Sequence, residues 1–133
     1  MSGSTLSLFE RIGGMPAVNA AVDVFYQKVL RDPRISHFFR MINMDTQAGK
    51  LKAFLAYAFG APMKFTGKSL REAHKHMHLT EEHFQAVAEN LASTLEELHV
   101  GQDLINEVVV IAVSTKDAVL NAPIPGEKVS LRA

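Results

Sequence analysis

Apolar residues recur at the spacing of an α-helix along almost the whole of this chain. The first long segment follows the pattern i, i+3, i+4, i+7 and i+11, at Val18, Ala21, Val22, Phe25 and Val29. Such positions share one helix face, because an α-helix turns once in about 3.6 residues. Similar patterns occupy residues 44–58, 80–98 and 102–120, and a shorter candidate lies at 69–77. The periodicity therefore predicts an all-α protein.

Glycine and proline residues separate these helical segments. Gly13-Gly14 and Gly101 interrupt the pattern, while Pro33 and Pro62 follow the first two long segments. Proline lacks an amide hydrogen, and the residue before it avoids the helical conformation. The chain has 133 residues and a mass of 14.6 kDa, which suits one domain. We expect that domain over residues 1–122 and a flexible C-terminal tail over residues 123–133.

The composition excludes several classes of protein. Fourteen Lys and Arg residues balance fourteen Asp and Glu residues, so the basic excess typical of nucleic-acid binding is missing. The absence of cysteine rules out disulfide scaffolds, iron–sulfur clusters and thiolate zinc sites. No apolar run approaches the roughly 20 residues of a membrane span, and no secretory signal is recognisable. We therefore expect a cytoplasmic protein with neither nucleic-acid nor membrane partners.

Histidine is the residue type that could bind a metal here. Two histidines four residues apart, His74 and His78, would share a helix face and could chelate zinc or copper. The segment lacks the glutamate of a HExxH motif, and no third ligand is evident. Surface histidines on a polar helix are the alternative interpretation. The remaining histidines are His37, His76, His83 and His99.

Aromatic residues gather in the first half of the chain, ahead of His74. They are Phe25, Tyr26, Phe38, Phe39, Phe54, Tyr57, Phe59 and Phe65. The ordinary interpretation is an aromatic core. The alternative is that together they line a large, flat, apolar cavity. The residues alone leave both open.

Several segments in collinear order resemble the group I truncated haemoglobins, with cyanobacterial and algal members nearest. They are LFERIGG at 8–14, AAVDVFYQKVL at 20–30, DPRISHFF at 32–39, KAFLAYAFG at 52–60, LREAHK at 70–75 and EHFQAVAENL at 82–91. The resemblance extends over residues 8–120. It implies a two-over-two helical globin domain around haem b, with the helix before the third long segment reduced to a short turn.

On one side of the haem, the resemblance implies that His74 is the proximal iron ligand. A neutral imidazole nitrogen suits iron, and a single axial histidine leaves the opposite coordination position open. The family has no counterpart of His76 or His78 as ligands, so we expect both at the surface, with His78 at most near the haem edge. The position of His83 is often histidine in the family without a role at iron.

On the other side, Tyr26 matches the tyrosine that donates a hydrogen bond to bound dioxygen. Gln47, Lys50 and Leu51 match the positions nearest the sixth coordination site and share one helix face. Gln47 would extend the hydrogen-bond network of Tyr26. The family often has glutamine where this chain has Leu51, so we expect fewer polar groups on this side.

The resemblance also implies further haem contacts. Phe39 matches the phenylalanine that stacks on haem, and Phe54 matches a residue at the ligand tunnel. The other expected contacts are Phe25, Phe38, Lys50, Leu51, Leu70, Met77 and Phe84. Some relatives carry a histidine on the last helix that bonds covalently to the haem. Residues 114–116 read Ser-Thr-Lys here, so we expect haem to be held without a covalent bond.

Lys50 has two interpretations. A histidine at this position binds iron in some cyanobacterial relatives, and a lysine does so in an algal relative. In other members the lysine reaches a haem propionate or solvent. Coordination requires the neutral amine, which opposes the ordinary lysine pKa of about 10.4.

The resemblance implies reversible binding of dioxygen, nitric oxide and carbon monoxide. Oxidation of nitric oxide, which needs a reductase partner, or a peroxidase-like activity could follow. The alternative is a haem-based sensor or electron-transfer protein in which Lys50 is an internal sixth ligand. A third interpretation is a haem-free helical module, or a zinc-binding bundle that uses His74 and His78.

Overall fold

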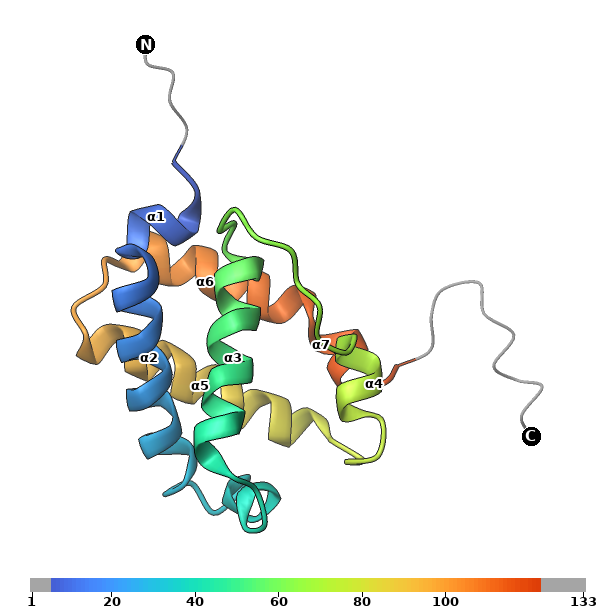
Figure 1. Cartoon of the computed structure of the whole chain (residues 1–133). Helices are drawn as coiled ribbons and strands as arrows, with labels where there is room; N and C mark the ends of the chain where they lie inside the picture. Colours follow the sequence, from blue (N-terminus) through green and yellow to red (C-terminus); the bar gives the residue numbers. More distant parts are fainter. Residues whose placement is uncertain (1–5, 123–133) are drawn as a thin grey trace.

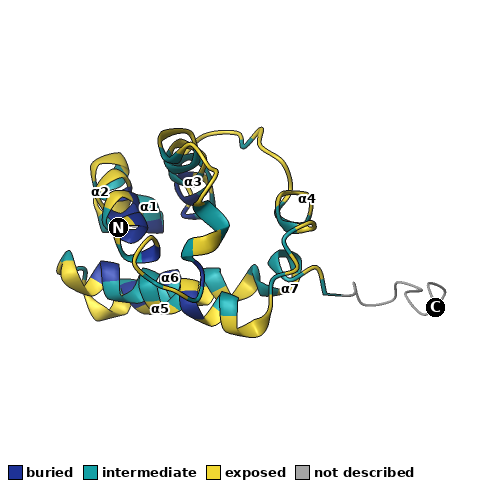
Figure 2. Ribbon diagram, turned by 90° about the horizontal axis from the view of Figure 1, so that it is seen from below, coloured by how far each residue is buried: buried dark blue, intermediate teal, exposed yellow. Residues whose placement is uncertain are grey.

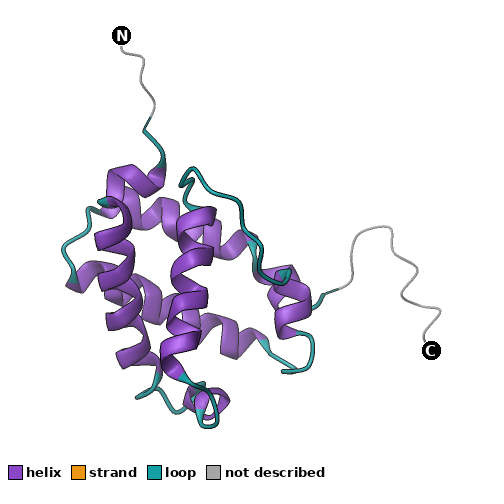
Figure 3. Ribbon diagram, in the orientation of Figure 1, coloured by secondary structure: helices purple, strands orange, loops and turns teal. Residues whose placement is uncertain are grey.

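A computed structural model describes residues 6–122, and within that range the chain is helical without strands (Figure 3). Its elements are α1 (Leu8–Ile12), α2 (Gly14–Val29), the 3-10 helix η1 (Ser36–Phe39), α3 (Met44–Ala58), α4 (Leu70–His74), α5 (Glu81–Glu97), α6 (Gln102–Ser114) and α7 (Lys116–Val119). The all-α prediction is confirmed. The predicted flexible tail over residues 123–133 lies outside the described residues.

The four long helices pack as two crossed layers. Helix α2 packs against both α3 and α5, and α5 packs against α6. Figures 1 and 2 show α2 and α3 in one layer and α5 and α6 in the other, with α4 and α7 together at one end. This arrangement confirms the two-over-two globin fold. Among the described helices, none has the length and apolar character needed to cross a membrane.

Local signals place the helix boundaries. Gly13 and Gly14 have φ values of 117° and 70°, a left-handed conformation that glycine adopts without a steric cost, and this turn separates α1 from α2. The side chains of Asn43 and Thr80 accept hydrogen bonds from the first turns of α3 and α5. Asn43 and Thr80 are therefore the N-caps of α3 and α5.

Two boundaries differ from the sequence prediction. The short helix expected at 69–77 ends at His74, and the segment 102–120 divides into α6 and α7. At the second point, the hydroxyls of Ser114 and Thr115 donate to the carbonyls of Ile111 and Ala112. Such side-chain bonds compete with the helical backbone bonds and favour a break.

The apolar faces of α2 and α5 are buried to different degrees. All five residues of the predicted α2 face are buried. On the apolar face of α5, Phe84 and Leu91 are only partly buried, and Val87 is 38% exposed. Phe84 and Val87 line a cavity outside the packed core, whereas Leu91 both lines this cavity and packs against the core.

Hydrogen bonds between charged and polar side chains connect the turn after α2 to α5. Both carboxylate oxygens of Asp32 accept hydrogen bonds from the Arg34 guanidinium, at 3.0 and 2.8 Å. Asn90 donates to Asp32 at 2.9 Å, and Arg34 also donates to Glu89 at 2.9 Å. The Arg34 hydrogen bonds hold the pKa of Asp32 well below its ordinary value. The network therefore connects the segment that precedes Phe38 and Phe39 to the opposite layer.

Asp32→Asn should lower the free energy of unfolding by about 1–3 kcal/mol at pH 7, because it leaves Arg34 with a weaker acceptor. The folded-state pKa of Asp32 is lowered, so its contribution is present above the unfolded pKa of about 4 and is lost as the pH falls below it. The difference in the free energy of unfolding between variant and parent should therefore become smaller below about pH 4. Urea unfolding at several pH values, followed by the circular dichroism of the helices, measures this difference.

Asp23→Asn is the matched control, since the Asp23 carboxylate is 62% exposed and pairs with Lys52 at 3.3 Å. It should change stability by less than about 1 kcal/mol. Equal effects of the two substitutions would contradict a special role for the Asp32 network.

Candidate functional site

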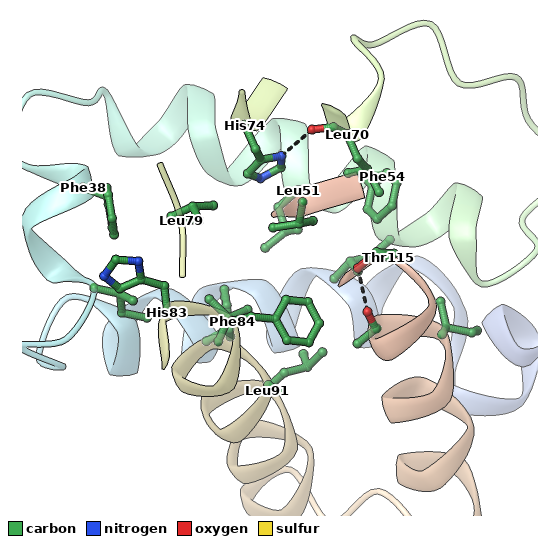
Figure 4. Close-up of a pocket in the computed structure, with 18 of the residues that line it drawn as sticks. Phe38, Leu51, Phe54, Leu70, His74, Leu79, His83, Phe84, Leu91 and Thr115 are labelled. Atoms are coloured by element: carbon green, nitrogen blue, oxygen red, sulfur yellow. Dashed lines mark hydrogen bonds between the residues drawn. The ribbon is translucent and has the colours of Figure 1, made fainter. Parts of the chain in front are cut away.

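A large apolar cavity of about 220 Å³ lies between the two layers, bounded by α3, α4, α5, α6 and α7 (Figure 4). The described structure brings to its wall eight of the apolar residues expected around a cofactor: Phe25, Phe38, Phe39, Leu51, Phe54, Leu70, Met77 and Phe84. His74 joins them, and among the other lining residues only His83 and Thr115 are polar. An apolar cavity with few polar groups is typical of a cofactor or small-molecule site.

His74 is held in one tautomer by its own helix. Its Nδ1 lies 2.7 Å from the carbonyl oxygen of Leu70, one turn earlier in α4. A carbonyl can only accept, so Nδ1 carries the proton and donates it. The lone pair of the neutral ring is therefore on Nε2, the arrangement that second-shell hydrogen bonds impose on metal-binding histidines. Figure 4 shows the His74 ring on one side of the cavity and Phe84 and Leu91 on the other.

His83, also on the cavity wall, is held in the opposite tautomer. Its Nδ1 accepts a hydrogen bond of 3.0 Å from the backbone N–H of Thr80, so the proton of the neutral ring is on Nε2. Its ring meets Phe38 edge-on, with centroids 4.9 Å apart. In these tautomers His74 offers a lone pair at Nε2, whereas His83 offers an N–H donor. The family resemblance implied no role at iron for His83; the sequence signal for its orientation is the Thr-x-x-His capping pattern, in which histidine replaces the usual glutamate.

The remaining histidines do not join His74. Because α4 ends at His74 and His78 has a φ of 53°, the two residues do not share a helix face. The predicted geometry of a two-histidine chelate is therefore wrong. His76, His78, His37 and His99 are exposed. Across residues 6–122 no three His, Asp or Glu side chains gather in a group that could hold a metal ion.

The donor set fits a metal that brings most of its own ligands. His74 is a single imidazole on an otherwise apolar wall, which suits iron already bound in a flat macrocycle. Phe25, Phe39 and Phe54 supply the aromatic surface that such a ring contacts.

Tyr26 and Gln47 meet behind this wall. Tyr26 is 7% exposed, and its hydroxyl oxygen accepts a hydrogen bond of 3.1 Å from the Gln47 side-chain amide. Because that oxygen is the acceptor, the phenolic hydrogen is left for another partner. Burial raises the pKa of Tyr26, and the Gln47 hydrogen bond opposes this shift. The Tyr26 ring packs against Phe25 and Phe39, with centroids 5.3 and 5.7 Å away.

Lys50 is placed differently from its neighbour Leu51. Leu51 lines the cavity, whereas Lys50 is exposed and is not among the lining residues. No ion pair of Lys50 is formed within the described part of the chain. Its coordination of iron stays a prediction.

A second apolar cavity, of about 200 Å³, adjoins the first. The two share Leu55, Phe59, Leu91 and Val108 as walls. Phe54, expected at a ligand tunnel, lines the larger cavity. The tunnel itself stays a prediction.

Comparison with known proteins agrees with this geometry. Residues 7–121 match the family described as bacterial-like globin. The group 1 truncated haemoglobin GlbN of Synechocystis sp. is 50% identical over 110 residues, covering 80% of this chain and 89% of the relative. The group 1 truncated haemoglobin LI410 of Chlamydomonas moewusii is 49% identical over 119 residues, covering 88% and 70%.

A solved structure shows the same agreement in three dimensions. The 2/2 haemoglobin from Synechococcus sp. PCC 7002 superposes with a TM-score of 0.85 at 48% identity, covering 87% of this chain and 99% of that one. With the helical order, the apolar cavity and its single well-placed imidazole, these similarities show that the chain belongs to the bacterial-like globin family, as a group 1 truncated haemoglobin whose cofactor is haem b.

Proposed function

We propose that His74 is the protein ligand of the haem iron and that the protein reversibly binds dioxygen and other diatomic molecules on the side of Tyr26. The observation that carries this proposal is the hydrogen bond from His74 Nδ1 to the Leu70 carbonyl, which leaves the Nε2 lone pair for iron. When bound, the iron supplies an open coordination position for dioxygen, nitric oxide or carbon monoxide. A purified protein without a Soret band would overturn the proposal.

The cavity wall holds the cofactor by apolar contact and excludes water. Leu51, Phe54 and Phe84 are only partly buried in the described structure, so they have apolar surface left for a bound ring. Burying such surface contributes about 25 cal/mol per Å². The Nε2–H of His83 is a suitable donor for a carboxylate at the cavity edge.

We propose that this attachment involves no covalent bond. The Synechococcus haemoglobin structure carries covalently attached haem. Residues 114–116 of this chain have no histidine, and Thr115, which lines the cavity, donates its hydroxyl hydrogen to the Ala112 carbonyl.

Tyr26 and Gln47 would act together on a ligand of the iron. Gln47 donates to the Tyr26 oxygen and so directs the phenolic hydrogen elsewhere, toward a ligand that carries partial negative charge. The raised pKa of Tyr26 keeps the hydroxyl protonated, and therefore a donor, at neutral pH.

Two reactions are compatible with this site. Oxidation of nitric oxide to nitrate by the dioxygen-loaded protein requires a reductase partner, and peroxidase-like protection requires access of peroxide to the same position. Rapid mixing of the dioxygen-loaded protein with nitric oxide, followed by nitrate measurement, separates a dioxygenase from a simple carrier. A stoichiometric, millisecond formation of nitrate supports the dioxygenase.

A second candidate is a sensor or electron-transfer protein in which Lys50 supplies an internal sixth ligand. It is favoured by the place of Lys50 on α3, one turn after Gln47, and by the absence of an ion pair for its amine within residues 6–122.

His74→Gly should lose haem, or retain a five-coordinate spectrum only when imidazole is added, because no other Nε2 lone pair faces the cavity in the described structure. The visible spectrum of the ferrous protein measures this. His78→Ala is the matched control, since His78 is exposed and should leave the spectrum unchanged. An unchanged spectrum for His74→Gly together with a changed one for His78→Ala would overturn the assignment.

Tyr26→Phe should raise the dioxygen dissociation rate by about ten- to a hundredfold. The lost hydrogen bond to a partially charged ligand is worth roughly 1.5–3 kcal/mol, and about 1.4 kcal/mol corresponds to a factor of ten. Carbon monoxide is less polar, so its dissociation should change far less. Stopped-flow measurement of both ligands checks this, and equal changes would indicate a packing effect instead.

Lys50→Ala decides between the two interpretations of Lys50. If Lys50 coordinates iron, the parent ferric protein should be low-spin at alkaline pH and become high-spin as the pH falls, because only the neutral amine binds. The variant should then stay high-spin or hydroxide-bound and bind added ligands faster. An alkaline ferric spectrum that Lys50→Ala leaves unchanged would exclude coordination.

A further inference from the structure

Helix α4, which carries His74, is short and has α7 as its main helical neighbour. Figures 1 and 2 show these two helices together at one end of the molecule, away from α2. An irregular segment, residues 61–69, leads into α4. The position of α4 therefore depends on what α7 provides.

Two hydrogen bonds connect the helices in opposite directions. The Arg71 guanidinium Nη1 donates to the Ala122 carbonyl oxygen at 2.7 Å. The Asn121 side-chain amide donates to the Arg71 carbonyl oxygen at 3.3 Å. Each helix end thus contributes one side-chain donor and one backbone carbonyl acceptor. We call this pair of hydrogen bonds the α4–α7 clasp.

The α7 half of the clasp is built by a specific helix end. The backbone N–H of Asn121 donates to the Ala118 carbonyl, and that of Ala122 donates to the Asp117 carbonyl. These bonds, with Asn121 at a φ of 55°, form a Schellman motif in which asparagine takes the left-handed position. The motif fixes both the Asn121 side chain and the Ala122 carbonyl that face Arg71.

The α4 half leads directly to the imidazole. The Leu70 carbonyl that orients His74 Nδ1 precedes Arg71 in the chain. A displacement of the α4 backbone at Arg71 therefore moves the acceptor that sets the ring direction. Val119 of α7 lines the same cavity as Leu70 and His74, so both helices form one wall.

We propose that Arg71 and Asn121 are positioning residues for the iron ligand: the clasp holds α4, and through the Leu70 carbonyl the His74 ring, in a fixed position at the cavity. The inference rests on the proposed role of His74. It assigns the end of α7 a part in haem retention and in the geometry of the bond between His74 and iron.

Arg71→Met tests the clasp in the haem-loaded protein. The rate of hemin transfer to an excess of a haem-scavenging apoprotein should rise by about tenfold, because a hydrogen bond from a charged donor is lost. The iron–histidine stretching band of the ferrous, unliganded protein should shift or broaden in resonance Raman spectra. Arg71→Lys, which keeps a charged donor for Ala122, should restore most of the parent behaviour.

Asn121→Gly is the second variant, because glycine keeps the left-handed turn while removing the donor to Arg71. It should raise hemin transfer by about threefold, and it decides the question if Arg71→Met does not hold haem. Arg11→Met is the matched control: it removes two hydrogen bonds to Glu107, at 2.6 and 2.7 Å, that connect α1 to α6. It should leave the iron–histidine band unchanged.

Faster hemin transfer with an unchanged band in both clasp variants would overturn the positioning role, and so would parent-like behaviour in both measurements. The proposed role of His74 would instead be overturned if the parent protein shows no iron–histidine band, or if His74→Gly leaves that band in place. The two failures are therefore distinguishable.

Discussion

Crossed helices touch only near their crossing points, and this geometry governs the rest of the molecule. The apolar face of α5 extends past the packed core, so Phe84 and Val87 line open space, and Leu91 lies both against the core and on the cavity wall. A domain with such a hollow has a smaller core of its own, centred on Val18, Val22, Val29 and Val108. Anything that fills the hollow only in the folded state also stabilises the fold.

The polar groups on the cavity wall are few, and one atom of each already forms a hydrogen bond within the protein. His74 donates to a carbonyl, His83 accepts from a backbone N–H, and Thr115 donates to the Ala112 carbonyl. What remains is one imidazole lone pair, one imidazole N–H and the acceptor lone pairs of the Thr115 hydroxyl. Backbone groups therefore decide which histidine offers a lone pair and which offers an N–H, although the two side chains are chemically identical.

The two sides of the cavity are supported differently. On one side, Tyr26 is buried within the packed layer of α2 and α3, where Gln47 and Phe39 hold it. On the other, α4 is a short helix at the edge of the fold, and two hydrogen bonds connect it to the end of α7. The packed layer thus carries the Tyr26 hydroxyl, and a short helix at the edge carries the His74 imidazole.

The sequence by itself determined the elements and the family. The period of apolar residues predicted the long helices, and the paired glycines predicted the break at Gly13-Gly14, because these features depend on neighbours within a few residues. The resemblance of its motifs identified a truncated globin and placed His74 among the cofactor contacts that the cavity wall now includes.

For the apolar residues that the family resemblance did not assign to the cofactor, only the tertiary structure decided which pack and which line the cavity, because periodicity marks a face but not what lies opposite it. It also decided that α4 ends at His74, which separates His78 from it, and that His83 is turned by Thr80 into a donor at the wall. Arg71 pairs with Asn121 and Ala122, which lie 50 and 51 positions later in the chain, and this pairing depends on the path of the chain through both layers. No local pattern encodes that path, since the contact exists only once the helices have crossed.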